Sequence, residues 1–415
     1  MRARIVVTDG EERSAVAACR GLASAGYGVC AVARCRPAAA HWSRASTERV
    51  LAPDPRESVE GFVDRLAELV RGRRCAALIP GSDASLHAVS EHREHLEPWT
   101  HLGLPSREAV WRSGDKLLLV DLAAEAGLAP PPSRSCTDRD GAVAAAAELG
   151  YPLVLKPARS CLPLNGGLRQ QRVVLVADEP SLARAAAGFT PPFLVQRFEQ
   201  AGFFSCTGVI ADGRLLALTT SRVFRLWPPP AGMHTYSETV PAPPGLVGRV
   251  RSLLTALEWQ GIFQLQLLEL ADGRLSVIDL NPRLFASMAL DVYAGANLAA
   301  IWCDWLLGLD RAPVIAQPGR RYRWEEGELC HLAWQLAHLR LRAAASVLVP
   351  HRRVAHAWLR LDDPGPLSAR ALGLALKGCK RLVLRFLGAA LQRTRRSSQR
   401  LVQRPAVDAP RAGRR

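Results

Sequence analysis

The sequence lacks the features that mark secreted, zinc-binding and membrane-spanning proteins. Its ten cysteines include no Cys-X-X-Cys pair, which argues against a zinc site and, in a chain of 415 residues, against a disulfide framework. We find no secretory signal at the start. The most apolar long window, 289–309, contains Asp291 and Asp304, so we expect a soluble helical segment there rather than a transmembrane helix. A reducing cytoplasm is the simplest location for such a chain.

Two further absences narrow the function. The segment TDGEERS, after the first expected strand, lacks the Gly-X-Gly-X-X-Gly spacing, which is mild evidence against a dinucleotide-dependent dehydrogenase. Lysine is scarce, because the 54 basic residues include only Lys116, Lys156, Lys377 and Lys380. In so arginine-rich a chain each lysine is informative, and two of them fall where a phosphate-binding cation would be needed.

Positive charge is concentrated at the C-terminal end of the sequence. Residues 391–415 hold eight arginines and one acid, and this net charge of +7 out of +16 leaves +9 for the rest. The tail is polar, so we expect it to be disordered. It could contact RNA, anionic lipid or an acidic partner, but a solvated tail without a specific role is favoured. The body has no basic stripe interleaved with aromatic residues, so no specific nucleic-acid binding is expected.

A basic helical pattern precedes the tail. A helix over 367–391 would place Arg370, Lys377, Arg381 and Arg385 near one face. Such a helix could lie on a membrane surface. We favour packing against the body of the protein.

The first hundred residues alternate strand and helix signals. Buried-strand patterns at 4–8, 28–34 and 75–83 are separated by helical patterns, which predicts a parallel α/β unit. Asp83 follows the last of these strands, at the end where ligands of α/β sheets bind. Turn capping is an equal alternative for this residue.

The most unusual stretch is LQLLELADGRLSVIDLNPRLFAS, residues 265–287. Asp272-Gly273 is a strong hairpin signal. A two-residue loop there pairs Ala271 with Arg274, and a longer loop would shift the register. Counting outward from the two-residue loop places four pairs on one face of the hairpin: Leu270 with Leu275, Leu268 with Val277, Gln266 with Asp279, and Gln264 with Asn281.

That face is apolar near the turn and polar at the far end, while the opposite face is apolar throughout. Buried amide and carboxylate oxygens need a partner, and a hard cation with oxygen ligands is one candidate. A strand end that reaches solvent through an Asn-Pro turn is the alternative.

In chain order these motifs resemble the ATP-grasp superfamily, in which two α+β subdomains clamp ATP between them. The motifs are a lysine on a helix, a lysine at a strand end followed by a Gly-bearing loop, the strand FLVQRF, and the oxygen-rich hairpin. The resemblance covers roughly residues 1–310, and VIDLNPRLFAS is its most specific part. Within the superfamily the chain looks most like the bacterial carboxylate–amine ligases.

The resemblance implies an order of domains along the chain. The domains would be a parallel α/β (pre-ATP-grasp) domain at 1–106, an ATP-grasp domain at 107–310 with a lid subdomain at about 125–195, a helical C-terminal region at 311–390, and the disordered basic tail at 391–415.

The resemblance also implies which residues bind ATP. Lys116 and Lys156 match the two phosphate-contacting lysines. The loop 159–168 matches a flexible lid over the β- and γ-phosphates, with Gly166 and Gly167 allowing close backbone approach. The strand whose backbone reads adenine would consist of Gln196, Arg197 and Phe198.

On the metal side, Gln266, Asp279 and Asn281 match the three Mg²⁺ ligands, and Arg283 matches the arginine at the transferred phosphoryl group. The resemblance and the register count independently place residue 266 opposite residue 279. ATP and Mg²⁺ are therefore the expected ligands.

The chain departs from the family pattern at several positions. Gln266 stands where an acid is usual, Asp279 where glutamate is usual, and Arg197 where another acid is usual. The carboxylate expected on the ribose falls near Phe203 or Phe204. One formal negative charge is few for a magnesium site, although the phosphates of ATP supply most of the anionic ligands. A catalytically impaired ATP-binding protein that acts through partners is therefore the alternative to an active ligase.

An active member of this type converts a small-molecule carboxylate to an acyl phosphate, which an amine attacks to give an amide, ADP and phosphate. Lys156 and Arg283 would act on the transferred phosphoryl group. Arg222 and Arg225 are candidates to hold a substrate carboxylate, at even odds with ordinary solvated strand arginines. For Glu238 we favour a surface acid over a substrate-binding group. The sequence does not indicate the oligomeric state.

Overall fold

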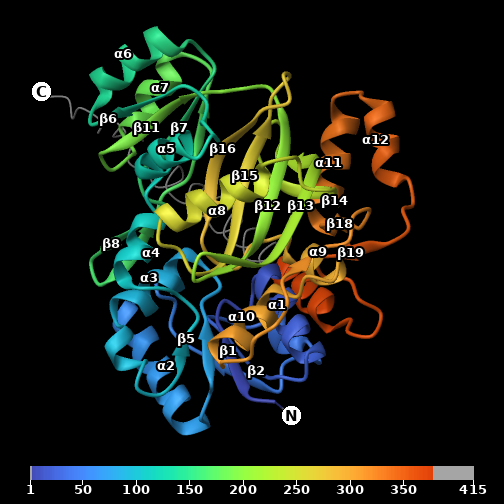
Figure 1. Ribbon diagram of the computed structural model, residues 1–415. Helices are drawn as coiled ribbons and strands as arrows, with labels where there is room; N and C mark the ends of the chain where they lie inside the picture. Colours follow the sequence, from blue (N-terminus) through green and yellow to red (C-terminus); the bar gives the residue numbers. More distant parts are fainter. Residues whose placement is uncertain (1, 377–415) are drawn as a thin grey trace, which may run out of the picture.

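A computed structural model describes residues 2–376 (Figure 1). The expected tail at 391–415, together with Lys377, Lys380, Arg381 and Arg385, lies outside the described residues. Among the described residues, no helix is long and apolar enough to cross a membrane.

The N-terminal part is a five-stranded sheet in the order β3-β2-β1-β4-β5, with all pairs parallel. The predicted parallel α/β unit is therefore confirmed. Its strands are β1 (Arg4–Val7), β2 (Gly28–Ala33), β3 (Glu48–Leu51), β4 (Ala77–Ile79) and β5 (His101–Leu102). Its helices are α1 (Arg13–Ser24), α2 (Val59–Arg73) and α3 (Asp83–Glu91). The central strands are buried, as is usual for a parallel sheet covered on both faces.

Two short helices, α4 (Arg107–Ser113) and α5 (Lys116–Glu125), lead to a four-stranded sheet in the order β10-β7-β11-β6. The strands of this sheet are β6 (Ser133–Cys136), β7 (Leu153–Pro157), β10 (Val174–Val176) and β11 (Phe193–Arg197). Two helices pack on it, α6 (Arg139–Leu149) and α7 (Glu179–Ala186). We call this unit the lid subdomain. It stands away from the N-terminal sheet, at the upper left of Figure 1.

The central body is a large sheet with the path β16-β15-β12-β13-β14-β18-β19, to which β17 adds beside β13. Its long strands are β12 (Gly202–Ala211), β13 (Arg214–Trp227), β14 (Met233–Thr239), β15 (Gly261–Glu269) and β16 (Leu275–Asn281). Three helices pack against this body: α8 (Leu246–Ala256), α9 (Met288–Tyr293) and α10 (Leu298–Leu306).

The region after residue 310 was expected to be helical, and it contains both helices and strands. Its helices α11 (Glu325–Ala337) and α12 (Leu341–Leu348) form a pair at the right of Figure 1. Three short strands extend the large sheet: β17 (Val314–Ile315), β18 (Arg321–Arg323) and β19 (Val354–His356). Strands of two or three residues have no measurable periodicity, so the sequence pattern could not reveal them.

The β15–β16 hairpin follows the predicted register only at its polar end. Gln266 pairs with Asp279 and Gln264 with Asn281, so these two predicted pairs are confirmed. Near the turn, the pairs are Leu268 with Ser276 and Leu267 with Val277, and the predictions for Leu268 and Leu270 were wrong.

Two opposite irregularities explain this outcome. The amide of Leu270 donates to the carbonyl of Arg274 at 2.9 Å, so the loop holds three residues rather than two. The register then shifts back at a β-bulge after Gln266, where Ile278 is the extra residue. The bulge restores the predicted pairing at the polar end.

The Gly-bearing loop at 159–168 is also more regular than expected. Residues Cys161–Leu164 (β8) and Gly167–Gln170 (β9) form a small antiparallel hairpin. The φ angles of Asn165 and Gly166 are 49° and 76°, which is the backbone of an Asn-Gly two-residue turn. The dipeptide was itself a hairpin signal in the sequence.

Candidate active site

Two lysines from different elements meet at strand β16. Lys116 is the first residue of α5, and its ammonium group forms an ion pair with the carboxylate of Asp279. Lys156 lies on β7 of the lid subdomain, and its Nζ donates to the carbonyl of Ile278 at 2.6 Å. The amide of Lys116 also donates to the carbonyl of Ala158 at 2.9 Å, which ties α5 to the end of β7.

The bulge explains why this carbonyl is available. Ile278 is the residue without a direct partner on β15, so its backbone can bond outside the ladder. The same irregularity that restores the register therefore supplies an acceptor for Lys156.

Both ammonium groups are buried. Burial lowers the pKa of Lys156 from 10.5 to about 8; the carboxylate of Asp279 opposes this shift and the charge of Lys116 adds to it. Two buried cations next to one carboxylate leave an excess of positive charge, which suits a polyanionic ligand.

The oxygen-bearing side chains share one face of the hairpin, as predicted. The side-chain nitrogen of Gln264 donates to Oγ of Ser205 and to Oγ of Ser287, both at 3.4 Å. Its side-chain oxygen accepts from Nδ2 of Asn281 at 3.3 Å. The side chain of Gln266 has no hydrogen-bond partner anywhere in residues 2–376, and it is only partly exposed.

The guanidinium group of Arg283 is fixed by hydrogen bonds to Asp83 and to Asn281. Its Nε and one terminal nitrogen donate to the two carboxylate oxygens of Asp83 at 2.7 and 3.0 Å, and it also donates to Oδ1 of Asn281 at 2.8 Å. Burial raises the pKa of Asp83, but the charge of Arg283 outweighs this and holds the pKa below its usual range.

Asp83 therefore has a role that the sequence left open. It begins α3, whose N-cap is Ser82, and its carboxylate binds Arg283 rather than capping a turn. The pair joins the N-terminal sheet to the end of β16 across 200 residues of sequence.

The side chains present fit a magnesium ion by their chemistry. Gln266, Asp279 and Asn281 offer amide and carboxylate oxygens, the ligands that Mg²⁺ prefers. One oxygen of Asp279 bonds to Lys116 and that of Asn281 to Arg283. Within the described residues, the side-chain oxygen of Gln266 and the second carboxylate oxygen of Asp279 accept no hydrogen bond.

Comparison with solved structures decides the fold. The chain superposes on the biotin carboxylase domain of a 2-oxoglutarate carboxylase from Hydrogenobacter thermophilus, solved with MgADP, with a TM-score of 0.59 and 15% identity over 77% of this chain and 73% of that chain. It also superposes on a carboxyaminoimidazole ribonucleotide synthase from Aspergillus clavatus, solved with ATP, with a TM-score of 0.59 and 14% identity over 77% and 80% of the two chains. The chain has the ATP-grasp fold.

Two further comparisons agree with this ATP-grasp fold. An L-amino acid ligase from Bacillus licheniformis superposes with a TM-score of 0.56 and 15% identity, over 77% of this chain and 78% of that chain. The C-terminal section of the carbamoyl phosphate synthase large chain from Aquifex aeolicus is 24% identical over 192 residues, 42% of this chain and 33% of that protein. The match thus spans about a third of this curated relative. No family model matches the chain.

The strand expected to read adenine is β11, and its polar groups are engaged within the lid subdomain. The side chain of Gln196 donates to Oγ of Ser133 at 2.8 Å. The amides of Arg197 and Phe198 donate to the carbonyls of Pro132 and Pro152 at 2.9 and 3.1 Å. Arg197 stands at the position where the resemblance led us to expect an acid. Its side chain forms an ion pair with Glu199.

The β8–β9 hairpin, with Gly166 and Gly167, lies against the N-terminal part of the molecule. The amide of Val59 donates to the carbonyl of Gly166 at 3.0 Å, and the amide of Leu168 donates to the carbonyl of Arg56 at 3.2 Å. The expected flexible lid is therefore a hairpin with a defined docking surface.

Arg222 does not join the other candidate residues. It pairs with Phe204 across the sheet, whereas Gln266 pairs with Ser205, so Arg222 points to the opposite face. There it forms a two-point ion pair with Glu269 at 2.5 and 2.8 Å and is exposed. Arg222 therefore lies on the face away from Gln266, as the solvated-arginine alternative expects.

Arg225 and Glu238 are also held by ion pairs, but neither is an exposed surface residue. Arg225 forms an ion pair with Glu328 at 2.5 Å and lies over the ring of Tyr236. Glu238 pairs with Arg321 at 2.7 Å. Phe204, near the position expected for the ribose acid, belongs to the buried core.

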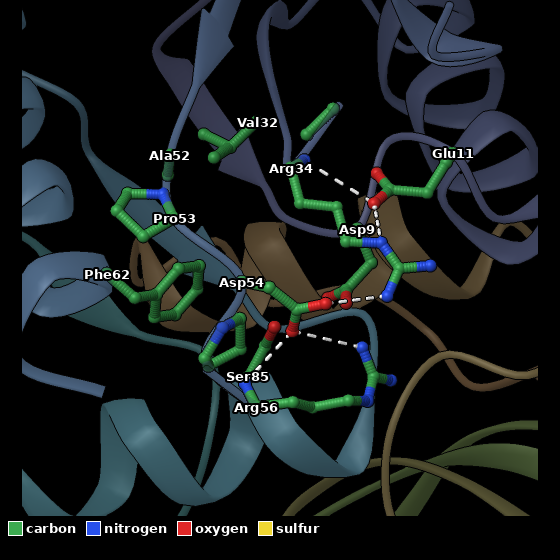
Figure 2. A pocket seen from close by; sticks show the side chains of 12 residues that line it. Asp9, Glu11, Val32, Arg34, Ala52, Pro53, Asp54, Arg56, Phe62 and Ser85 are labelled. Carbon is green, nitrogen blue, oxygen red and sulfur yellow. Dashed lines mark hydrogen bonds and ion pairs between the residues drawn. The ribbon is translucent and has the colours of Figure 1, made fainter. Parts of the chain in front are cut away.

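A small pocket lies at the carboxyl ends of β1, β2 and β3, with a cavity of only about 10 Å³ (Figure 2). Ion pairs dominate it. Arg34 binds both Glu11 and Asp54 at 2.7 Å, and Arg56 reaches Asp54 at 3.3 Å. Burial raises the pKa of Glu11 to about 7.

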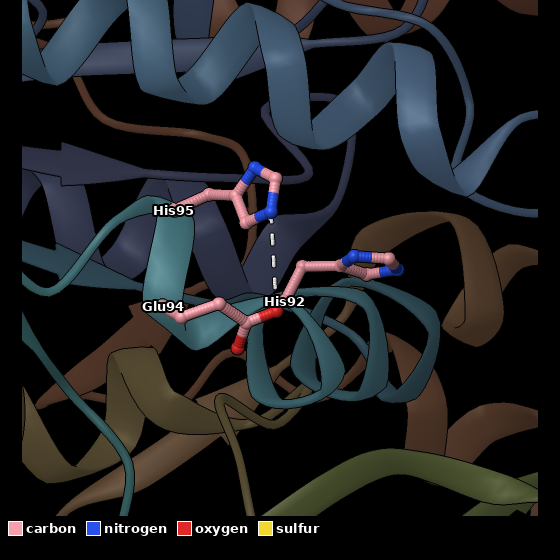
Figure 3. A group of neighbouring side chains, drawn as sticks. All are labelled: His92, Glu94 and His95. Carbon is pink, nitrogen blue, oxygen red and sulfur yellow. Dashed lines mark ion pairs between the residues drawn. The ribbon is translucent and has the colours of Figure 1, made fainter.

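A second group of possible metal ligands lies on the surface, far from the hairpin in sequence (Figure 3). The ligand atoms of His92, Glu94 and His95 lie within 4.8 Å of one another. Glu94 and His95 are exposed, and Glu94 also binds Arg107 at 3.2 Å. Cysteine spacing and the oxygen-rich hairpin were the metal signals in the sequence, and neither indicates this group. Its exposure and the ion pair of Glu94 with Arg107 do not favour a bound metal.

Proposed function

We propose that this chain binds Mg²⁺-ATP between its lid subdomain and the β15–β16 hairpin, and that it activates a carboxylate as an acyl phosphate for attack by an amine. One observation carries the proposal. Two buried ammonium groups, on α5 and β7, meet the oxygen-bearing face of the hairpin beside a fixed arginine. Lys116, Lys156 and the hairpin lie far apart in the sequence, and no stability argument requires two buried lysines at one carboxylate.

Each residue then has a role in phosphoryl transfer. Lys116 and Lys156 hold the phosphates as point charges. Gln266, Asp279 and Asn281 would hold Mg²⁺, which neutralises phosphate charge when bound. The β8–β9 hairpin with Gly166 and Gly167 would cover the phosphates, and the segment Gln196–Phe198 would border adenine.

Arg283 is placed to stabilise the charge that develops during transfer. A carboxylate oxygen bonds to the γ-phosphorus while the bond to the bridging oxygen of ADP breaks. The amine nitrogen then bonds to the acyl carbon, the bond from that carbon to the phosphate oxygen breaks, and the nitrogen loses a proton. Asp83 keeps Arg283 in position throughout.

The solved structures that share the fold support this reading without extending to the substrate. They include an L-amino acid ligase and proteins solved with ATP or MgADP. The acid and the amine remain to be found by screening.

The test measures ADP release by the purified full chain with Mg²⁺-ATP across a panel of carboxylates and amines. Asp279→Asn and Arg283→Gln are each expected to lower turnover by roughly 10²-fold or more. Asp272→Asn is the matched control, because Asp272 lies in the same hairpin but is exposed in the loop. Equal turnover in Asp279→Asn and Asp272→Asn would contradict the proposal.

A second candidate is an ATP-binding protein that does not turn over and acts through partners. The observation that favours it is that Asp279 is the single carboxylate of the three expected metal ligands and already forms an ion pair with Lys116. Calorimetry separates the two candidates. Binding of Mg²⁺-ATP without ADP release across the whole panel supports the second candidate, and absence of binding contradicts both.

A further inference from the structure

Helix α11 has its polar side buried and an apolar side exposed. The buried residues include Glu328, His331 and Gln335. Glu328 pairs with Arg225, His331 contacts the carbonyl of Leu226 at 2.9 Å, and Gln335 contacts His331 at 2.9 Å. This arrangement inverts the usual orientation of a helix on a soluble protein.

The exposed side of α11 carries Leu329, Ala333 and Leu336, which are spaced by four and three residues and so form one stripe. Leu329 is 67% exposed and Leu336 48%. Helix α12 repeats this pattern with Leu341, Ala345 and Leu348.

Both leucines of α12 are about two-thirds exposed, and Leu339, in the turn between the helices, is 83% exposed. We call this surface the leucine ridge. It consists of Leu329, Leu336, Leu339, Leu341, Leu348 and Val349, and the pair α11–α12 carries it at one side of the molecule (Figure 1).

The charge around the leucine ridge is of one sign. From residue 329 to residue 361 the sequence contains five arginines, four histidines and no acidic residue. Arg340, Arg342, Arg352 and Arg353 are all exposed.

The acids that precede the ridge on α11 are already engaged. Glu328, next to Leu329, pairs with Arg225 at 2.5 Å. Glu325 accepts hydrogen bonds from the amides of Trp358 and Leu359, and Glu326 pairs with Arg370 at 2.8 Å. Exposed aliphatic side chains together with arginines, in a segment without acidic residues, are typical of a peripheral membrane-binding surface.

We propose that the leucine ridge docks on an anionic lipid surface, with its leucines in the interfacial layer and its arginines on lipid phosphates. A second copy of the chain would bring the same arginines face to face. The segment 377–415 carries twelve basic residues and one acid, so it shares the sign of charge and is an equally poor occupant. A lipid surface fits better than an acidic protein, because the leucines project from a helical pair instead of lining a groove.

The test is sedimentation of the full chain with vesicles at physiological salt. We expect binding to vesicles of phosphatidylglycerol in phosphatidylcholine and none to phosphatidylcholine alone. The triple variant Leu336→Gln, Leu339→Gln, Leu348→Gln should lower partitioning by roughly tenfold or more. Each arginine near the surface contributes about fivefold, so Arg340→Gln with Arg342→Gln should lower it by roughly 25-fold.

Two matched controls keep the result specific. Ile315→Gln removes an apolar side chain that is 79% exposed on β17, and Arg65→Gln removes an exposed charge on α2. Both should bind as the parent chain does. Circular dichroism confirms that the variants fold, and Mg²⁺-ATP binding, which involves none of these residues, keeps the outcome separate from the proposed function.

Three results would overturn the proposal. The first is no binding of the parent chain to anionic vesicles. The second is unchanged binding of the leucine variant, which would assign binding to the basic residues after 376. The third is a parent chain that self-associates, with the leucine variant monomeric and still vesicle-bound, which would make the ridge a contact between copies.

Discussion

Lys156 shows how a single side chain takes its chemistry from its surroundings. Its ammonium group is buried among the end of β7, the bulge of β16 and Lys116. Burial and the like charge of Lys116 both disfavour its charged form, whereas the carboxylate of Asp279 favours it. Arginine at this position would stay charged at any accessible pH, which gives a physical reason for a lysine in an arginine-rich chain.

This environment predicts the pH dependence of nucleotide binding. Lys156 is charged below its pKa of about 8, so affinity for Mg²⁺-ATP should be level from pH 7 to 8. Above pH 8 the free protein must first take up a proton, and affinity should fall by up to about tenfold per pH unit. Calorimetry between pH 7 and 9.5 measures this.

The variant Lys156→Gln is the control for this prediction. It should bind more weakly at pH 7 and show no decline above pH 8. A decline that persists in Lys156→Gln would place the titrating group elsewhere.

At the scale of elements, the β15–β16 hairpin shows why part of a site can be predicted and part cannot. The pairing of Gln266 with Asp279 was predictable because the alternation of side chains and a turn signal both constrained it. The longer loop and the bulge at Ile278 were not predictable. The same four residues, Ala-Asp-Gly-Arg, occur in both hairpins, but the loop holds two residues at 212–213 and three residues at 271–273.

The choice between these two turns depends on how the following strand packs. At β16 the amide of Val277 donates to the carbonyl of Leu128 at 3.2 Å, and Oγ of Ser276 donates to the carbonyl of Ala129 at 2.7 Å. These partners are almost 150 residues away in the sequence, so the local pattern around the turn could not predict the contacts.

The β8–β9 hairpin allows a matched pair of glycine substitutions. A Cβ added at Gly167 would lie 2.2 Å from the carbonyl oxygen of Arg56, whereas one at Gly166 would meet nothing within 4 Å. Gly166 has a φ of 76°, so Gly166→Ala should cost only the roughly 1–2 kcal/mol of a left-handed residue. Gly167→Ala must displace the hairpin from the N-terminal part of the molecule.

We therefore expect different results from the two variants. Hydrogen exchange at residues 161–170 should accelerate strongly in Gly167→Ala and only slightly in Gly166→Ala. Affinity for Mg²⁺-ATP should fall in the same order, because the hairpin is proposed to cover the phosphates. Equal exchange in both variants would show that contact with Arg56 does not hold the hairpin.

At the scale of the whole molecule, a few long-range polar contacts join parts that the sequence could only describe separately. Alternating strand and helix patterns predicted the N-terminal sheet, because each pattern is local. The pair of Arg283 with Asp83 spans 200 residues and that of Arg20 with Asp363 spans 343. No periodicity connects positions so far apart, so the sequence identified Arg283 as a candidate without its partner.

Asp363 is the clearest of these long-range contacts and gives a prediction about stability. It accepts from Nε of Arg20 at 2.8 Å, from Oγ of Ser43 at 2.6 Å and from the amide of Arg44 at 2.9 Å. Both Arg20 and Asp363 are buried. Asp363→Asn would leave a buried guanidinium group without its counter-charge, which should lower the free energy of unfolding by on the order of 3 kcal/mol.

The neighbouring residue provides the control for this prediction. Asp362 forms its ion pair with Arg360 on the surface, where its side chain is 64% exposed, so Asp362→Asn should change stability by at most about 0.5 kcal/mol. Thermal and urea unfolding of both variants at pH 7 measures the difference, and hydrogen exchange in α1 shows whether it arises at Arg20. Because the two substitutions are chemically identical and adjacent, similar unfolding of both variants would mean that Asp363 does not hold the C-terminal region on the N-terminal sheet. Those two parts would then be joined by their remaining contacts, which include the hydrogen bonds from Arg20 to the carbonyl of Trp358 at 3.0 Å and from Arg44 to the carbonyl of Asp362 at 2.9 Å.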